Sequence, residues 1–260
     1  MMSPMRRLAG HDPEPDVRSF AVTPALGTIV PPQPPGWDQL LYATTGVMTV
    51  VTEVGTWVVP PHRAVWVPSG LDHHIDLTGR VQLRSLYLAQ GLGPDLPGCR
   101  AVNVTPLLRE LVLETVRRAP LWLDDPSDAR VVGLLLEQLE ALPDAPLQLP
   151  SPRDPRALVV AELLRGGGGS SAPAGDLDQA CAQAGASRRT VERLFRAETG
   201  LGLGEWRTRA RLVEAARLLA EGATVTSVAV QVGYATPSAF GAAFRRVLGT
   251  TPGRWLDGAS

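Results

Sequence analysis

The sequence predicts an α+β protein of two domains. The N-terminal half is expected to form a β-barrel followed by two helices, and the C-terminal half an all-helical domain with two helix-turn-helix units joined by a long helix. Three observations lead there: short strand-like runs between Phe20 and Leu88, two amphipathic stretches after them, and a 49-residue repeat near the C-terminus. A chain of 260 residues suits two domains of ordinary size.

The N-terminal half begins with a polar, proline-rich segment, residues 1–18, which predicts a poorly ordered arm. Residues 19–100 then alternate between apolar runs and turn residues such as Gly, Pro and Asp, a pattern typical of strands. The strand candidates are 40–42, 47–51, 56–59, 64–67 and 81–88. Several short strands in succession favour a small barrel or sandwich.

Residues 101–143 predict a pair of amphipathic helices, Pro106–Ala119 and a leucine-rich helix, Ser127–Leu142. These helices either pack against the barrel or form the seam of a homodimer, and the two roles are compatible. The five prolines from Pro143 to Pro155 predict a linker over 144–155.

The segment 156–260 carries the repeat. Its first copy places apolar residues at helical spacing, then a turn, then a second apolar stripe; the second copy does the same. Ser187 and Thr236 stand where N-cap oxygens would satisfy the first free amides of each second helix. These two residues are 49 positions apart, as are Phe195 and Phe244, so the units are in register.

The segment from Gly204 to Glu221 reads as one continuous helix between the two copies. Such a helix spans about 25 Å. It would hold two recognition helices about 34 Å apart, which is one turn of DNA. The glycine run Gly166–Gly169 lies earlier in this half and is either a long loop inside it or a flexible boundary.

The charge is distributed unevenly along the chain. The net charge is −1, but residues 1–150 hold 11 Arg against 16 acidic residues (−5), and 151–260 hold 14 Arg against 10 (+4). The basic half is the one with the helix-turn-helix pattern, which predicts double-stranded DNA as the partner. No apolar run is long enough to span a bilayer and the N-terminus lacks the apolar core of a signal peptide, so we expect a cytoplasmic protein with no membrane partner.

The second unit carries a series of residues at fixed spacing: Gly233-Tyr234, Ser238, Phe240, Phe244-Arg245-Arg246, Gly249, Thr251-Pro252 and Trp255. With this series the last 105 or so residues resemble the DNA-binding domain of the AraC/XylS family of bacterial transcriptional regulators. The resemblance implies a sequence-specific regulator and no enzyme. RNA polymerase is a further partner if the protein activates transcription.

Residues 37–88 resemble the cupin-type sensor domain of one branch of that family, through Trp37–Ala43, Gly46, Trp57, Pro60–Pro68 and His73. Cupins that bind metal carry a His-x-His pair and a Glu, but Gln33, Pro35 and Gln39 stand at those places here. We therefore expect no metal and no other cofactor. The alternative function, a cupin-fold enzyme fused to a DNA-binding module, would need the ligands that are missing.

A barrel mouth of this kind is a natural pocket for a small organic effector. The candidate pocket residues are Gln39, Tyr42, Trp66 and His73. A barrel that has lost its ligand altogether is the other interpretation.

The first recognition helix is expected to turn a charged face to DNA, because Val191, Leu194 and Phe195 take its core side. Its candidate DNA contacts are Ser187, Arg188, Arg189, Thr190, Glu192, Arg193 and Arg196. Arg189 and Arg193 are predicted to contact guanine, while Glu192 either accepts from a cytosine amine or orients an arginine. The alternative is a solvated basic face that contacts phosphates alone.

The second recognition helix shows smaller side chains. Its candidate contacts are Thr236, Pro237, Ser238, Gly241, Arg245 and Arg246. With few long polar groups near its start, this helix is predicted to position the protein while the first unit specifies sequence. Arg246 either contacts a phosphate or pairs with a neighbouring acid.

Overall fold

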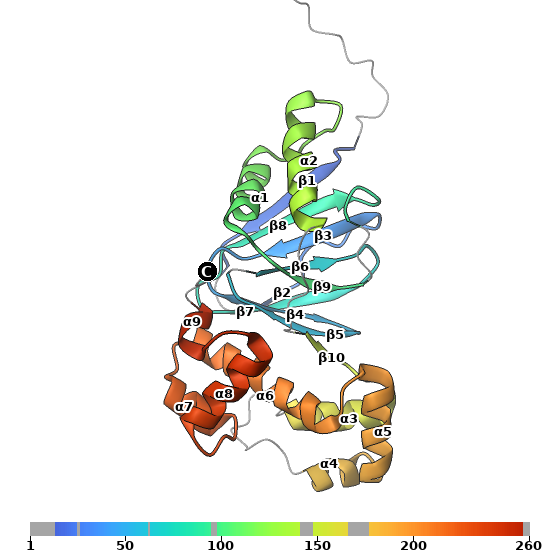
Figure 1. Ribbon diagram of the computed structural model, residues 1–260. Helices are drawn as coiled ribbons and strands as arrows, with labels where there is room; N and C mark the ends of the chain where they lie inside the picture. The colour runs from blue at the N-terminus through green and yellow to red at the C-terminus, as the bar shows by residue number, and fades with distance from the viewer. Residues whose placement is uncertain are drawn as a thin grey trace, which may run out of the picture.

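The computed structural model describes residues 14–24, 27–61, 63–94, 98–140, 148–165 and 177–256. Several expectations fall wholly or partly outside these ranges, among them the first 13 residues of the arm, residues 141–142 of the second predicted helix, residues 144–147 of the linker, the run Gly166–Gly169, and residues 257–260 of the DNA-binding domain. Within them, the N-terminal half is built of strands with two helices and the C-terminal half is helical, which confirms the predicted fold class (Figure 1).

The N-terminal half contains two antiparallel sheets of five strands each in the described chain. The first has the order β1-β8-β3-β6-β9, formed by Val17–Val22, Leu83–Ala89, Trp37–Tyr42, Arg63–Val67 and Arg100–Asn103. The second has the order β10-β5-β4-β7-β2, formed by Gln148–Pro150, Gly55–Val59, Val47–Thr52, His73–Thr78 and Gly27–Ile29. The strand β10 lies within the predicted linker and extends the second sheet.

The two sheets share an inner core made of alternate residues from facing strands. Leu41 and Val65 of the first sheet meet Val50, Trp57 and Ile75 of the second there, all almost fully buried. Among the described residues the backbone hydrogen bonds form two separate sheets, so the predicted barrel is open and resembles a sandwich.

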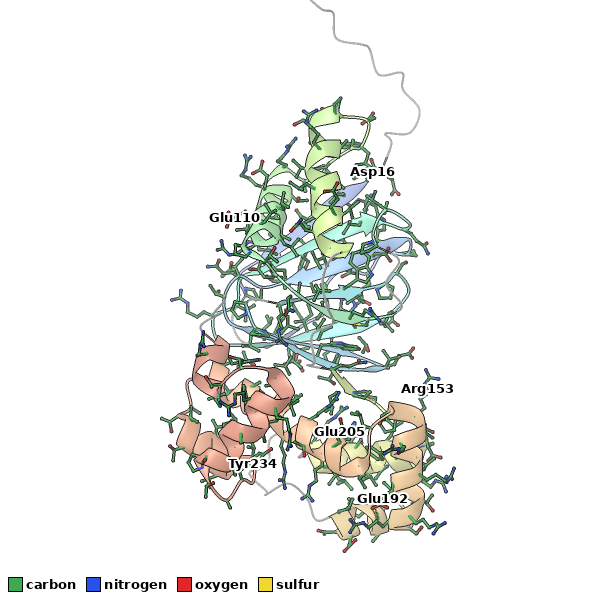
Figure 2. All side chains as sticks on the ribbon, in the orientation of Figure 1. Asp16, Glu110, Arg153, Glu192, Glu205 and Tyr234 are labelled. Carbon is green, nitrogen blue, oxygen red and sulfur yellow. The ribbon has the colours of Figure 1, made fainter. Side chains whose placement is uncertain are left out.

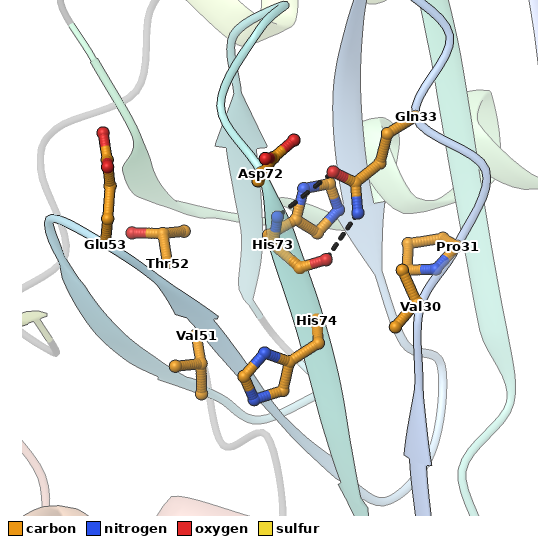
Figure 3. A pocket seen from close by; sticks show the side chains of 9 residues that line it. All are labelled: Val30, Pro31, Gln33, Val51, Thr52, Glu53, Asp72, His73 and His74. Carbon is orange, nitrogen blue, oxygen red and sulfur yellow. Dashed lines mark hydrogen bonds between the residues drawn. The ribbon is translucent and has the colours of Figure 1, made fainter.

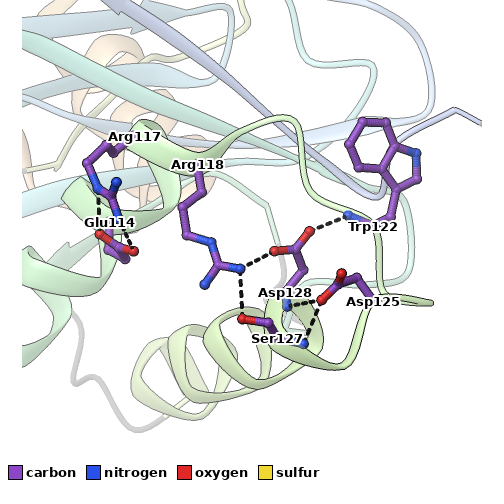
Figure 4. A network of polar contacts seen from close by, with 7 residues as sticks. All are labelled: Glu114, Arg117, Arg118, Trp122, Asp125, Ser127 and Asp128. Carbon is purple, nitrogen blue, oxygen red and sulfur yellow. Dashed lines mark hydrogen bonds and ion pairs between the residues drawn. The ribbon is translucent and has the colours of Figure 1, made fainter. Parts of the chain in front are cut away.

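Helices α1 (Pro106–Arg118) and α2 (Pro126–Glu140) cover the outer face of the first sheet (Figure 1). Their buried leucines, among them Leu108 and Leu135, pack against the side chains that point outward from β3 and β6. Polar contacts fix the corner between the helices, where Arg118 forms an ion pair with Asp128 and donates to Ser127 Oγ at 3.0 Å (Figure 4).

The C-terminal half contains seven helices in its described part: α3 (Pro155–Arg165), α4 (Leu177–Gln183), α5 (Arg188–Thr199), α6 (Leu203–Ala220), α7 (Val225–Gln231), α8 (Pro237–Leu248) and α9 (Pro252–Leu256). They form two cores. The first-unit core joins α3, α4, α5 and the start of α6, and the second-unit core joins the rest of α6 with α7, α8 and α9.

The second sheet packs directly on the helical half (Figure 1). Val47 and Val58, on the outer face of that sheet, belong to the second-unit core. Leu149 of β10 belongs to the first-unit core, although its strand pairs with β5. The N-terminal half, with strand β10, therefore contacts both helix-turn-helix units. Among the described helices, none combines the length and hydropathy that crossing a bilayer requires.

Candidate nucleic-acid interface

Helix α5 is fixed at both ends by its own sequence. Ser187 is its N-cap, and its Oγ accepts a hydrogen bond from the backbone N–H of Thr190 at 3.3 Å. At the other end Gly200 adopts the left-handed conformation with φ 72°, which favours glycine. Val191, Leu194 and Phe195 hold the inner side of the helix in the first-unit core. The outer side of α5 is thereby presented on a rigid element.

The outer side of α5 is almost entirely charged. Arg188, Arg189, Glu192, Arg193 and Arg196 are all exposed, as the helical periodicity predicts. Glu192 accepts a hydrogen bond from Arg188 Nε at 3.0 Å, and this contact raises the pKa of Arg188. Arg189, Arg193 and Arg196 form no ion pair within the described chain. Three guanidinium groups on this face are thus available to an outside partner.

Helix α8 repeats this construction with a different surface. Thr236 Oγ1 accepts from the backbone N–H of Ala239 at 3.1 Å, and Pro237 occupies the first turn. Thr236, Pro237 and Ser238 are exposed at its start, and a Cβ added at Gly241 would meet no atom within 4 Å. The start of α8 thus offers small groups and open space for close approach.

Arg245 and Arg246 are exposed near the C-terminal end of α8. Neither forms an ion pair within the described residues. No contact found there competes with the phosphate contacts predicted for Arg245 and Arg246.

The two units correspond residue by residue. The N-caps Ser187 and Thr236, the fully buried Phe195 and Phe244, and the left-handed glycines that end the helices, Gly200 and Gly249, are each separated by 49 positions. Each phenylalanine also packs edge-on against a tryptophan: Phe195 with Trp206 at a centroid distance of 5.1 Å, and Phe244 with Trp255 at 6.0 Å.

Helix α6 is part of both cores. Trp206 and Ala210 in its first half are buried with α3 and α5, whereas Ala216 and Leu219 in its second half are buried with α7 and α8. Its 18 residues correspond to a length of about 27 Å. The connection between the units is consequently a shared structural element and not a spacer.

Sequence reasoning missed a residue of α6 that holds the turn before α8. Arg211 extends over the ring of Tyr234, 5.9 Å from its centroid, and its Nη1 lies 3.5 Å from the carbonyl oxygen of Gly233. Figure 2 shows Tyr234 at this turn and Glu192 on α5, both in the helical half. The spacing of Arg211 from a turn 22 residues later gave no signal of this contact.

The structure separates the four candidate pocket residues into two pairs. Gln39 and His73 point into the space between the sheets, at 4% and 5% exposure. Each lies two residues before a residue of the inner core, Leu41 or Ile75, and therefore shares its face of the strand. Tyr42 and Trp66 lie on the opposite face of the first sheet, where they pack with α1 and α2. Gln39 and Tyr42 are three residues apart on one strand, which places them on opposite faces.

Three further polar residues accompany Gln39 and His73. Gln33 was noted in the sequence only at the place of a metal ligand, and Tyr87 and Ser85 were missed. Gln33 exchanges two hydrogen bonds with the main chain of His73 (Figure 3). Tyr87, opposite Gln39 in the sheet, donates to the Pro32 carbonyl at 2.8 Å, and burial raises its pKa to about 12. Ser85 is fully buried on the same strand as Tyr87. The one available signal for Ser85 and Tyr87 was their spacing of two and four residues from the apolar Leu83, which places all three on one face of the strand.

Comparisons with known proteins place the chain among regulators. A family model described as a helix-turn-helix domain matches residues 180–258. The HTH-type transcriptional regulator NimR of Escherichia coli is 32% identical over 218 residues, covering 84% of this chain and 79% of that protein. The HTH-type transcriptional regulator RipA of Corynebacterium glutamicum is 38% identical over 110 residues, 42% of this chain and 32% of that protein.

Among solved structures, the DNA-binding domain of AdpA, a global transcriptional factor in complex with a target DNA, is 34% identical. It covers 40% of this chain and 92% of that chain, with a TM-score of 0.34.

Proposed function

This chain belongs to the AraC/XylS family of DNA-binding transcriptional regulators, and we propose that it divides the recognition of DNA unequally between its two helix-turn-helix units. Helix α5 reads base edges in the major groove. The observation that carries this assignment is its row of exposed guanidinium groups, Arg189, Arg193 and Arg196, which have no partner within the described chain. Arg189 and Arg193 are one turn apart and suited to bidentate contacts with guanine O6 and N7.

The pairing of Glu192 with Arg188 supports the second of its two predicted roles. A carboxylate that already accepts from Arg188 at 3.0 Å orients that arginine, and has less capacity left for a cytosine amine. In this arrangement Arg188 reaches the backbone of the DNA while its neighbours read bases. Ser187 and Thr190, at the start of the helix, lie where phosphate contacts form in such motifs.

Helix α8 positions the protein on the duplex. Pro237, Ser238 and Gly241 allow close approach, while Arg245 and Arg246 supply two cations that form no ion pair within the described residues. Phosphate contacts fix register and orientation without carrying sequence information directly. Since α6 is a packed part of both cores, α5 and α8 enter successive segments of the major groove as one body.

The experiment is a selection of genomic DNA fragments by the purified full-length protein at physiological salt, read by sequencing. We expect a motif of two segments about one helical turn apart, with the stronger base preferences in the segment under α5. Enrichment without a motif would contradict sequence-specific reading and leave only backbone binding.

The N-terminal half controls this activity through a small organic effector or through dimerisation. Support for an effector is the set of polar side chains between the sheets. Support for a homodimer is the outer side of α1 and α2, where Leu107 and Leu134 are 48% and 40% exposed. Sedimentation of wild-type protein and of a Leu107→Glu, Leu134→Glu variant distinguishes a dimer through this face from a monomer.

A further inference from the structure

Helix α6 is packed on two roughly opposite sides by the two helix-turn-helix units. Trp206 and Ala210 belong to the first-unit core, whereas Ala215 and Leu219 belong to the second-unit core. Successive residues of a helix are about 100° apart, which places these two pairs on opposite sides of α6. Two further sides of the helix therefore lie between the units.

One of these two sides faces the N-terminal half. The strands β5 and β10 both contact α6, and the carbonyl oxygen of Ala220 lies so close to the turn after β7 that a Cβ added at Gly79 would meet it at 3.3 Å. Ala216 and Arg209 lie four and eleven residues before Ala220 and share its side of the helix. Nε of Arg209 is buried, and its Nη2 donates to Glu205 at 3.1 Å. Arg209 is thus on the side of α6 that faces the sheets.

The other side of α6 carries Arg211 and, one turn earlier, Arg207. Arg211 is two residues from Arg209, which is about 200° around the helix. Its guanidinium lies 5.9 Å from the ring centroid of Tyr234. Figure 2 shows Tyr234 on the side of the helical half that is away from the sheets, together with Glu192 on the outer side of α5. Arg211 therefore lies on the same side of the molecule as the charged face of α5.

The guanidinium of Arg211 is weakly held. Nη1 lies 3.5 Å from the carbonyl oxygen of Gly233, and this distance and that to the Tyr234 ring are near the outer limits for such contacts. Gly233 is exposed, so the guanidinium meets this turn at the surface. In the described part of the chain Arg211 forms no ion pair. It can turn toward an outside anion without losing a strong contact.

The charges around Arg211 favour an anion. Burial raises the pKa of Tyr234, and the nearby charges of Arg211 and of Arg246 on α8 act against this rise, so two cations lie near one ring. Glu214, three residues after Arg211, already accepts two hydrogen bonds from Arg217, at 2.9 and 2.6 Å. Its carboxylate is therefore engaged along the helix, while Arg211 and Arg246 stand together beside the start of α8.

We propose that Arg211 binds a DNA phosphate between the two segments that α5 and α8 enter. Two recognition helices on one face of a duplex enter major-groove segments about 34 Å apart, and the minor groove with its phosphate backbones lies between them. Since α6 connects the two units, its side away from the sheets lies over this stretch. The assignment rests on the proposed function and adds to it a contact from the connecting helix.

The salt dependence of binding by the full-length protein tests this contact. Each phosphate contact adds about 0.9 to the slope of log affinity against log salt. Arg211→Gln should lose this increment, so the advantage of the wild type should shrink about 3.5-fold between about 50 mM and about 200 mM salt. Arg211→Lys keeps the charge and should keep most of the slope. A wild-type slope in Arg211→Gln would overturn the proposal and leave Arg211 as a support of the turn before α8.

The matched control is Arg209→Gln. It removes the same charge from the same helix, two residues away, but on the side that faces the sheets. Its slope should equal that of the wild type, and urea unfolding shows whether each variant is folded under the binding conditions. Equal decreases in Arg209→Gln and Arg211→Gln would indicate a general effect of net charge and contradict a local contact.

Neutral methylphosphonate linkages in the DNA locate the contact. Placed between the two segments of the motif that the protein selects, they should weaken binding of the wild type and have little effect on Arg211→Gln. Placed outside both segments, they should not distinguish the two proteins. Central linkages that weaken both proteins equally would refute the contact.

Failure of this proposal is distinguishable from failure of the proposed function. A protein that selects no DNA motif would contradict the proposed function itself. A protein that selects its motif, and whose slope falls in Arg245→Ala but not in Arg211→Gln, would overturn the assignment of Arg211 alone.

Discussion

The indole Nε1 of Trp206 donates a hydrogen bond of 2.7 Å to the main-chain carbonyl of Pro150. Pro150 ends β10, the strand that extends the second sheet, and Trp206 is fully buried in the first-unit core. Arg165 adds to the junction, since its guanidinium lies 5.6 Å from the Trp206 ring and donates to Ser151 Oγ at 3.2 Å. The side chain of Trp206 thus links the segment between the two halves to the first helix-turn-helix unit.

Replacement of Trp206 by Phe should lower the free energy of unfolding by about 1–3 kcal/mol, because the carbonyl of Pro150 loses its buried donor. The control is Trp255→Phe, since Trp255 is equally buried but its Nε1 has no hydrogen-bond partner among the described residues. Both variants lose the same volume, but Trp255→Phe also removes a buried donor that has no partner among the described residues, so Trp206→Phe should be the more destabilising of the two in urea unfolding. Equal losses would show that the bond to Pro150 contributes nothing.

Arg189→Ala should weaken DNA binding by about 1–3 kcal/mol at one base position and relax the preference there. The reason is the loss of a bidentate contact to a single base. Competition binding against operator variants that differ at one base pair checks this, with Arg130→Ala on α2 as the control for removal of an exposed arginine. A uniform loss across all sequences would assign Arg189 to a phosphate instead.

Arg245→Ala should weaken binding to all sequences alike, because a phosphate contact carries no base information. The slope of log affinity against log salt should fall by about one. Titrations at several salt concentrations, on the selected motif and on an unrelated duplex, measure both effects. Binding that matches the wild type would exclude Arg245 from the interface.

The stability of the protein should fall as pH drops below about 6.5, the ordinary pKa of histidine. Burial lowers the pKa of His73, so below that pH the unfolded chain binds a proton that the folded protein resists. The contribution is fully present above the unfolded pKa and is lost as pH falls toward the folded one. Urea midpoints measured between pH 7.5 and 5.5 give the slope.

His73→Gln should flatten that slope, since glutamine does not titrate. His74→Gln is the matched control, because the side chain of His74 is 42% exposed and belongs to the same strand. A slope that His73→Gln leaves intact would assign the pH dependence to other groups.

The helical half was predictable because its signals are local. Ser187 and Thr236 act within one turn of their helices, and the stripes around Phe195 and Phe244 repeat at 3.6 residues. The strand β10 was missed for the opposite reason. Three residues in a proline-rich segment have no pattern of their own, and they become a strand only because β5 offers an open edge.

The faces of the N-terminal sheets were harder to assign than the strands. Gln39 and Tyr42 were expected to share a pocket, yet strand alternation places them on opposite faces of β3, and Trp66 lies with Tyr42. Likewise, nothing local to Val47 or Val58 indicates that they face helices from the other end of the chain. Such contacts depend on how the folded strands and helices pack against one another, which no local sequence pattern indicates.

The burial of Leu149 in the first-unit core sets limits on recombination between regulators. A graft that joins a foreign sensor at Ser151 would remove Leu149 and Pro150 from the recipient and leave a hole beside Trp206. A crossover placed before Gln148 would carry both residues along with the DNA-reading half. The sheet of the foreign sensor must then pair with Gln148–Pro150 along one of its edges. The unit that can be exchanged between regulators is therefore the helical half together with strand β10.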